Sequence, residues 1–168
     1  MTVSALIELC LQGDRVAQRQ LYDNYKDNLY TTAYRLMSDF DQASDLLQET
    51  FIEAFKQLAN LRQPEYFHSW VKQILVRKAY RLLKKEKENV SLDKIGDISY
   101  QDNSDIEYIE KAIQQLPTKS RTVFVMTEIE GFSHKEIAEI MDISVGTSKS
   151  QLNYAKTKLK ELLKHHMI

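Results

Sequence analysis

Apolar residues recur every three or four positions through three long segments of this chain, and this spacing predicts amphipathic helices. Residues 17–36 place Ala17, Leu21 and Leu29 on one face, and residues 43–58 and 64–85 show the same spacing. The 168 residues include only four Gly and two Pro, and no segment alternates apolar with polar side chains. The sequence therefore predicts an all-α protein.

The helical spacing is lost over residues 87–105, where acidic residues, Ser, Asn and Gly predominate. Such a composition is typical of a flexible linker. Apolar spacing resumes at Ile109, and a further helix is expected over residues 117–130, with Ile129 facing inward. We therefore expect two small helical domains joined by a flexible acidic linker: residues 1–87, the linker at 88–105, and residues 106–168.

The net charge of −1 conceals a strong segregation of charge along the chain. Residues 1–61 carry −4, residues 62–87 carry +6, residues 88–118 carry −5 and residues 119–168 carry +2. Charges interact over only about 8 Å at physiological salt, so a polyanion would meet the local +6 and not the total. The basic segment is therefore a candidate nucleic-acid surface, and a merely solvated helix face is the alternative.

The sequence lacks the residue patterns of an enzyme, a metal site or a membrane protein. It contains no Gly-rich phosphate loop and no nucleophile with a matched base, and its four His show no metal-ligand spacing. The lone Cys10 excludes an internal disulfide and fits a reducing compartment, and we expect a buried thiol there. Apolar runs are far shorter than the roughly 20 residues of a membrane helix, and the N-terminus does not resemble a signal peptide. We expect a cytoplasmic protein without membrane insertion, metal or cofactor.

Residues 132–159 have the pattern of two helices joined by a tight turn. Ser133 and Glu136 have the spacing of a capping box, and Ser144 is placed to cap the second helix. Periodicity puts Val145 and Leu159 on the buried side of that second helix. Its other side carries hydroxyls, amides and lysines, which contact phosphates and base edges: Thr147, Lys149, Ser150, Gln151, Asn153, Tyr154 and Lys158. This arrangement predicts a DNA-binding helix-turn-helix, and an ordinary helical hairpin is the alternative.

Three stretches together resemble a bacterial sigma factor of the extracytoplasmic-function type. "DQASDLLQETFIEAFKQL" (residues 41–58) is similar to the family helix that docks on the clamp of core RNA polymerase. "YFHSWVKQILVRKAYRLLKKEK" (residues 66–87) resembles the segment that melts and recognises the promoter's minus-ten element. Residues 116–159 resemble the domain that recognises the minus-thirty-five element. The stretches follow the family's order, and the linker lies in the family's place.

The resemblance implies specific contacts for the N-terminal domain. Three polar residues, Asp45, Gln48 and Glu49, would pair with basic side chains of core RNA polymerase, and Phe51 and Phe55 would add apolar contact. Cations that would follow the phosphates of the melted minus-ten strand are Arg62, Lys72, Arg77, Lys78, Arg81, Lys84 and Lys85. Tyr66 and Phe67 would stack on its bases, as aromatic side chains do in single-strand binding, whereas the spacing of Trp70 favours a core position.

The resemblance also implies the partners. They are core RNA polymerase, promoter DNA and an anti-sigma factor; the free protein is expected to be a monomer, and catalysis would belong to the polymerase. The alternative function is a stand-alone dimeric helix-turn-helix transcriptional regulator. That alternative explains the C-terminal motif, but it leaves the +6 segment and the polar group Asp45–Glu49 without a role.

The second helix of the motif departs from the common family pattern Thr-Val-Lys-Ser-Arg-Leu. Here Ser148 replaces Val, Gln151 replaces Arg, and Tyr154 stands in place of a further Arg. Arg and Lys pair with guanine, whereas Gln and Asn pair with adenine, at about 1–3 kcal/mol per good pair. We therefore expect Gln151 and Asn153 to recognise A·T pairs in the minus-thirty-five element. Gln151→Arg should shift the element selected from random promoters towards guanine, and an unchanged selection profile would contradict this assignment.

Overall fold

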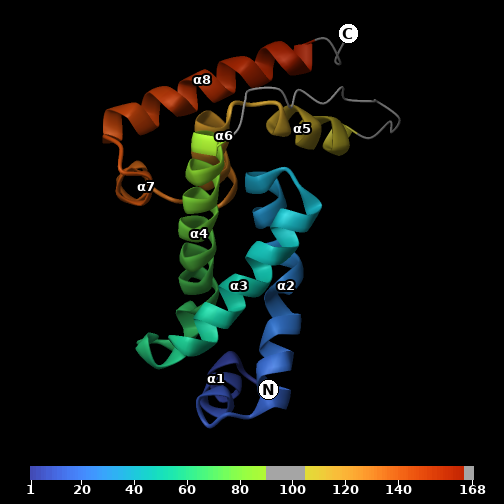
Figure 1. Ribbon diagram of the computed structural model, residues 1–168, viewed down its shortest axis with the longest axis vertical. Coiled ribbons are helices and arrows are strands. Elements are labelled where there is room, and N and C mark those ends of the chain that lie inside the picture. Colours follow the sequence, from blue (N-terminus) through green and yellow to red (C-terminus); the bar gives the residue numbers. More distant parts are fainter. Residues whose placement is uncertain (90–104, 165–168) are drawn as a thin grey trace. The chain divides into compact units, whose positions relative to one another are not determined.

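The computed structural model describes residues 1–89 and 105–164, and side chains are described for all of these except residues 87–89. The described residues form helices and no strand, which confirms the all-α prediction (Figure 1). The chain divides into two compact units, Met1–Arg81 and Leu82–Ile168. Most of the predicted linker, residues 90–104, lies outside the described residues. None of the described helices combines the length and apolar content that a membrane span requires.

Three helices of the first unit begin at side-chain caps. They are α1 (Val3–Leu11), α2 (Arg15–Met37) and α3 (Phe40–Lys56). The side chains of Thr2, Asp14 and Asp39 accept hydrogen bonds from backbone N–H groups three residues later, at 3.1, 3.1 and 2.9 Å. These bonds satisfy donors that have no partner inside the helix. The caps explain why the helices start where the polar residues stand, just before each apolar stripe.

The core of the first unit forms where α2 packs against α3 and α1 packs against α2. The Tyr22 ring of α2 meets the Phe51 ring of α3 edge-on, with centroids 4.8 Å apart. Helix α1 contributes Cys10, which is buried as expected; burial, with a smaller contribution from Asp14, raises the pKa of its thiol. The other buried apolar residues of these three helices are Leu6, Ile7, Ala17, Leu21, Leu29, Ala33, Leu36, Met37, Ala43, Leu46, Leu47 and Ala54.

Two short 3-10 turns, η1 (Leu58–Asn60) and η2 (Pro64–Tyr66), lead into the long helix α4 (Phe67–Asn89). Pro64 occupies the first position of η2, where its missing N–H costs nothing. At the start of α4, the Phe67 ring lies 5.3 Å from that of Tyr25 on α2. His68 Nε2 of α4 lies 2.8 Å from Asn28 Oδ1 of α2. These contacts hold the first turn of α4 against α2.

An ion pair between Glu53 and Lys78 joins α3 to α4. Glu53 also accepts a hydrogen bond from Gln57 Nε2 at 3.0 Å. The hydrogen bond from Lys78 is the main cause that lowers the pKa of Glu53. The two side chains are 32% and 23% exposed, so the pair is partly shielded from solvent.

The second unit is arranged around its last helix. It contains α5 (Asp105–Gln114), α6 (Thr118–Phe124), η3 (Val125–Ile129), α7 (His134–Met141) and α8 (Val145–Lys164). Helix α8 packs against α5, α6 and α7. Tyr108 of α5 donates a hydrogen bond to the Leu162 carbonyl of α8 at 3.1 Å.

The segment η3 is a turn of π-helix, which corrects the prediction of an uninterrupted helix over residues 117–130. The Glu130 N–H bonds to the Val125 carbonyl, five residues back, at 3.0 Å. Because this wider turn changes the helical register, Val125 and Met126 are buried while Ile129 is 37% exposed, contrary to its predicted inward position. Gly131, with φ +78°, then ends the helix as predicted.

Arg121 is a buried cation that ties α6 to the end of α5. Its Nη1 donates to the Leu116 carbonyl at 3.1 Å and to the Gln114 carbonyl at 3.4 Å. These carbonyls lie at and just beyond the C-terminus of α5, where backbone acceptors lack helical partners. Burial lowers the pKa of the Arg121 guanidinium.

Arg121→Met should destabilise the second unit, because it removes the donor and leaves buried carbonyls unpaired. We expect a loss of about 1–3 kcal/mol in the free energy of opening, measured by amide hydrogen exchange across α5 and α6. Lys119→Met, at an exposed position of the same helix, is the matched control and should change that free energy by less than about 0.5 kcal/mol. Equal protection in the two variants would contradict the structural role of Arg121.

The Glu53–Lys78 pair should make the stability of the first unit pH-dependent. Because the folded-state pKa of Glu53 is lowered, its stabilisation is complete above the unfolded-state pKa and is lost as the pH falls through the folded-state pKa. The difference in unfolding free energy between the wild type and Glu53→Gln should therefore shrink on acidification from neutral pH to about pH 3. Urea unfolding followed by the fluorescence of Trp70, the single tryptophan, measures this difference. A difference that stays constant over this pH range would contradict the contribution of the pair.

Candidate polymerase and DNA interfaces

Helix α3 exposes an acidic face on the side opposite its buried stripe. Asp41, Asp45, Gln48 and Glu49 are all exposed, whereas Leu46, Leu47 and Thr50 are buried. The three polar residues predicted to contact the polymerase thus lie together on one solvent-facing surface. We call the set Asp41, Asp45, Gln48, Glu49 and Ile52 the α3 acidic face.

The burial of Phe51 corrects the predicted source of apolar contact. Its side chain is 3% exposed and is held between the rings of Tyr22 and Phe55, so it offers no surface to a partner in this conformation. Phe55 is half-buried. Ile52 is 56% exposed instead, four residues after Gln48 and seven after Asp45. This helical spacing, which can be read from the sequence, identifies Ile52 as the apolar member of the surface.

Helix α4 brings together a cationic face, defined here as Trp70, Arg77, Arg81 and Lys84. These residues are separated by three, four or seven positions and therefore share one side of the helix. Arg81, Lys84 and Lys85 are exposed, and Trp70, Arg77 and Lys78 are half-buried. Lys72 does not join them, because five residues place it about 140° from Arg77 around the helix.

The aromatic residues before α4 divide into one exposed and one buried side chain. Tyr66 is 61% exposed in η2, next to the loop that carries exposed Arg62. Phe67 is fully buried, which corrects the prediction that it stacks on a DNA base, since Tyr25 and Trp70 pack against its ring. Trp70 is half-buried, and it lines a groove between α3 and α4.

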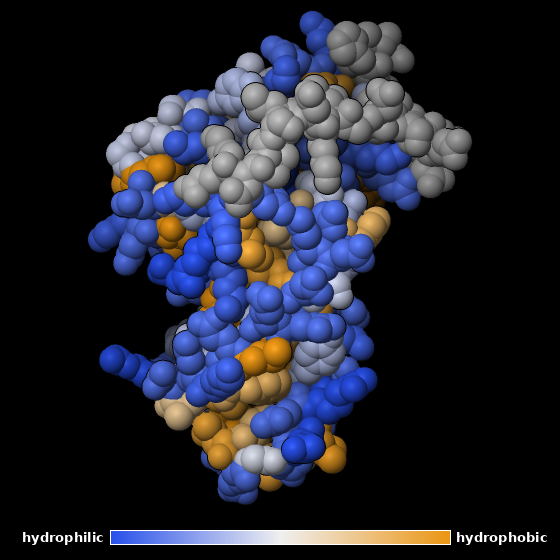
Figure 2. All heavy atoms as spheres, viewed as in Figure 1, coloured by the Kyte–Doolittle hydropathy of each residue, from blue (hydrophilic) through white to orange (hydrophobic). Residues whose placement is uncertain are grey.

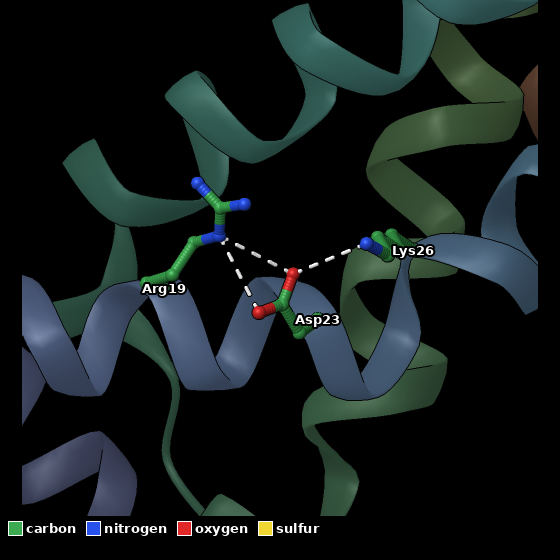
Figure 3. Close-up of polar contacts among 3 residues, drawn as sticks. All are labelled: Arg19, Asp23 and Lys26. Carbon is green, nitrogen blue, oxygen red and sulfur yellow. Dashed lines mark hydrogen bonds and ion pairs between the residues drawn. The ribbon is translucent and has the colours of Figure 1, made fainter.

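Two basic residues of α2, Arg19 and Lys26, share one acidic partner on the same helix. Asp23 lies between Arg19 and Lys26, with its Oδ1 3.3 Å from Arg19 Nε and 3.3 Å from Lys26 Nζ (Figure 3). The carboxylate partly neutralises both cations. Around Asp23, helix α2 therefore offers a weaker phosphate surface than the cationic face of α4.

Helices α7 and α8 form the predicted helix-turn-helix with both predicted caps. The Ser133 hydroxyl and the Glu136 carboxylate make the reciprocal bonds of a capping box, each at 3.1 Å. Ser144 Oγ accepts from the Thr147 N–H at 2.9 Å at the start of α8. The turn between the helices passes through Asp142, which adopts a left-handed conformation at φ 54°.

A polar contact joins the two helices of the motif. Ser148 is fully buried, and its Oγ lies 2.7 Å from His134 Nδ1 of α7. Val145, predicted to face the core, is 39% exposed because it occupies the first residue of α8, ahead of the crossing. The buried side of α8 thus comprises Ser148, Ala155 and Leu159.

The predicted base-contacting residues of α8 occupy two sides of its solvent-facing surface. Lys149, Ser150, Asn153 and Tyr154 are exposed, and Thr147, Gln151 and Lys158 are half-buried. Two residues along a helix turn by about 200°, so Gln151 and Asn153 lie about 160° apart. The structure therefore groups Gln151 with Thr147, Tyr154 and Lys158, and it does not bring the two amides together.

Exposed apolar side chains add to these polar surfaces. On the face drawn in Figure 2, hydrophilic side chains cover most of the described surface, with apolar patches between them. The exposed apolar residues include Phe40 and Ile52 on α3, Val16 on α2, and Ile106 and Ile109 on α5. Phe40 stacks on Tyr34, with ring centroids 4.6 Å apart, at the N-terminal end of the α3 acidic face.

Comparison with known proteins covers both units. The sequence family described as Sigma-70 region 2 matches residues 21–89, and Sigma-70, region 4 matches residues 106–159. The ECF RNA polymerase sigma-E factor of Haemophilus influenzae is 30% identical over 93% of this chain and 92% of its own. The ECF sigma factor SigW of Bacillus subtilis is 27% identical over 98% of both chains.

Solved structures agree with this relationship. The sigma factor RpoE from Bartonella quintana, in complex with the anti-sigma factor NepR, superposes with a TM-score of 0.64 at 25% identity, covering 87% of this chain and 96% of that one. CnrH, in complex with the cytosolic domain of CnrY, shares the fold with a TM-score of 0.59 at 23% identity over 96% of both chains. The protein belongs to the extracytoplasmic-function sigma factors, non-enzymatic initiation factors that direct RNA polymerase to promoters.

Proposed function

We propose a division of this activity among three surfaces. The α3 acidic face binds core RNA polymerase, the cationic face of α4 holds the melted minus-ten strand, and α8 contacts the minus-thirty-five element. The observation that carries this proposal is the exposure of Asp45, Gln48 and Glu49 on a helix whose opposite side is buried. Those side chains contribute nothing to the core, so a partner with basic side chains gives them a role.

The polymerase contact combines charge with one apolar anchor. Asp45 and Glu49 supply carboxylates, and Gln48 supplies an amide on the same face. Ile52 takes the place first given to Phe51, because it is the exposed apolar residue within the set. Protein interfaces concentrate their binding energy in a few such residues, with apolar anchors surrounded by polar ones.

The minus-ten contact combines cations with aromatic side chains. Arg77, Arg81 and Lys84 follow the phosphates, and exposed Tyr66 offers a ring on which an unpaired base stacks. Stacking returns about 1–3 kcal/mol per base, which roughly equals the few kcal/mol needed to take a base out of the duplex. The free protein therefore melts no DNA, and the polymerase supplies the rest.

The minus-thirty-five contact uses the side of α8 opposite Ser148, Ala155 and Leu159. Ser150, Asn153 and Tyr154 lie nearest the middle of that side, with Lys149 towards one edge and Thr147, Gln151 and Lys158 towards the other. Of the two amides, Asn153 is exposed and Gln151 is half-buried, so Asn153 is the better placed to meet base edges. Gln151 contacts the DNA from the flank of the helix.

An anti-sigma factor is the further partner that we propose. Its support is the related sigma factor that was solved with one, together with the exposed apolar residues Ile106 and Ile109 of α5. An apolar surface of this kind favours a protein partner over nucleic acid. The proposal also places the protein in the cytoplasm, where template and polymerase are found, as a monomer when it is not bound.

Reversing charge on the α3 acidic face should abolish the polymerase contact. Asp45→Lys combined with Glu49→Lys should weaken binding to core polymerase by at least about 30-fold, the effect of losing one interface hot spot. Affinity is measured with labelled sigma factor and purified core enzyme. Asp27→Lys, at an exposed position on α2, is the matched control and should bind like the wild type.

Reconstituted transcription from a random promoter library tests the whole activity. Wild-type protein with core polymerase should yield transcripts that share an upstream motif, and the doubly reversed variant should yield none. Normal binding and transcription by that variant would remove the α3 acidic face from the proposal. Ile52→Glu should behave like the double variant, whereas a normal result there would limit the contact to the charged residues.

A further inference from the structure

The groove between α3 and α4 is lined by cations and an aromatic ring, as a nucleotide site would be, and also by one acidic residue, Glu53. It has a volume of about 230 Å³ and is lined by Glu53, Gln57, Trp70, Gln73, Ile74, Arg77, Lys78 and Arg81. This volume lies below the roughly 300–1,000 Å³ of sites for drug-sized ligands and is large enough for one nucleobase. Three cations and an aromatic side chain favour an unpaired nucleotide. A carboxylate in such a groove needs a separate explanation.

Glu53 is held in the groove by two neighbours. Lys78 pairs with its Oε2, and Gln57 Nε2 donates to its Oε1 at 3.0 Å. A carboxylate has about four lone-pair positions, so both oxygens keep the capacity to accept a further bond. Lys78 also keeps the group ionised, since it lowers the pKa of Glu53. The groove therefore presents a fixed, charged acceptor.

Phosphate repulsion by Glu53 is offset by its neighbours. Arg77, Lys78 and Arg81 give the lining a net charge of +2 when Glu53 is counted. Among the side chains described, residues 1–86 and 105–164, Arg77 and Arg81 form no direct ion pair, although Arg81 also helps to lower the pKa of Glu53. Their guanidinium groups can therefore contact a phosphate. Trp70, which could stack on a base, and the two arginines line the same groove as Glu53.

We infer that Glu53 is a specificity-determining residue, which accepts a hydrogen bond from the exocyclic amino group of an unpaired cytosine in the minus-ten strand. Cytosine presents an N4 donor that suits a carboxylate, whereas thymine presents the O4 acceptor at the same place. Two facing acceptors repel each other, so thymine is rejected. This inference rests on the proposed minus-ten role of α4.

Glu53→Gln separates base recognition from simple electrostatics. A glutamine amide accepts from cytosine through its oxygen and donates to thymine through its nitrogen, so it tolerates both bases. Lys78→Met is the matched variant, because it breaks the same ion pair and leaves the carboxylate in place. Both variants lose the tie between α3 and α4, and only Glu53→Gln loses the acceptor.

The experiment uses holoenzyme reconstituted from core polymerase and each sigma variant, on templates with a pre-opened bubble in which every non-template minus-ten position carries cytosine or thymine. Wild-type holoenzyme should prefer cytosine at one position by about tenfold, which lies within the discrimination of a good base contact. Glu53→Gln should reduce that preference to less than about twofold. Lys78→Met should lower transcription from all templates and keep the preference.

The remaining outcomes separate the inference from the proposed function. If Glu53→Gln keeps the preference for cytosine, the inference is overturned and the proposed function stands. The same holds if the wild type shows no preference for cytosine at any position. A uniform gain on all templates for Glu53→Gln shows that the carboxylate only repels phosphates, and it also overturns the inference. Wild-type holoenzyme that starts no transcript on any template overturns the proposed function and, with it, the role of Glu53.

Discussion

The packing of α3 against α2 decides which side chains of the first unit can meet a partner. Leu46, Leu47, Thr50 and Phe51 fill the contact with α2 and its neighbours, and the 3.6-residue period leaves the remaining positions to solvent. A helix that is buried along one stripe cannot also present that stripe outward. The choice of Ile52 over Phe51 as an interface residue follows from this constraint alone. The same reasoning separates Arg77 and Arg81 from Lys72 on α4.

The sequence predicted the elements and their chemistry well, because both depend on local spacing. The caps at Ser133 and Ser144, the burial of Cys10 and the helical stripes all follow from residues a few positions apart. The prediction failed where residue type was allowed to outweigh position, as for Phe51 and Phe67, whose size suits an interface and a core equally. It also failed for Val145, because burial there depends on where α7 crosses α8. The hydrogen bond of Ser148 to His134 makes a buried hydroxyl acceptable at that crossing.

The pair between Glu53 and Lys78 has more consequence for geometry than for stability. A partly exposed ion pair contributes roughly 0–1 kcal/mol, too little to decide whether the first unit folds. It does link α3, which carries the acidic face, to α4, which carries the cationic face. Both members of the pair also line the groove beside Trp70. The two surfaces therefore share a mechanical connection, although they attract partners of opposite charge.

The π-helical turn at Val125–Ile129 affects how the chain enters the helices for which we propose the DNA contact. It holds one residue more than an α-helical turn would, and α7 and α8 follow directly after it. Since each helical residue rotates the chain by about 100°, losing that residue would re-aim the segment that enters α7 while every base-facing side chain stayed the same. With the minus-thirty-five contact that we propose for α8, a single-codon insertion or deletion some twenty residues upstream of that helix would change promoter choice.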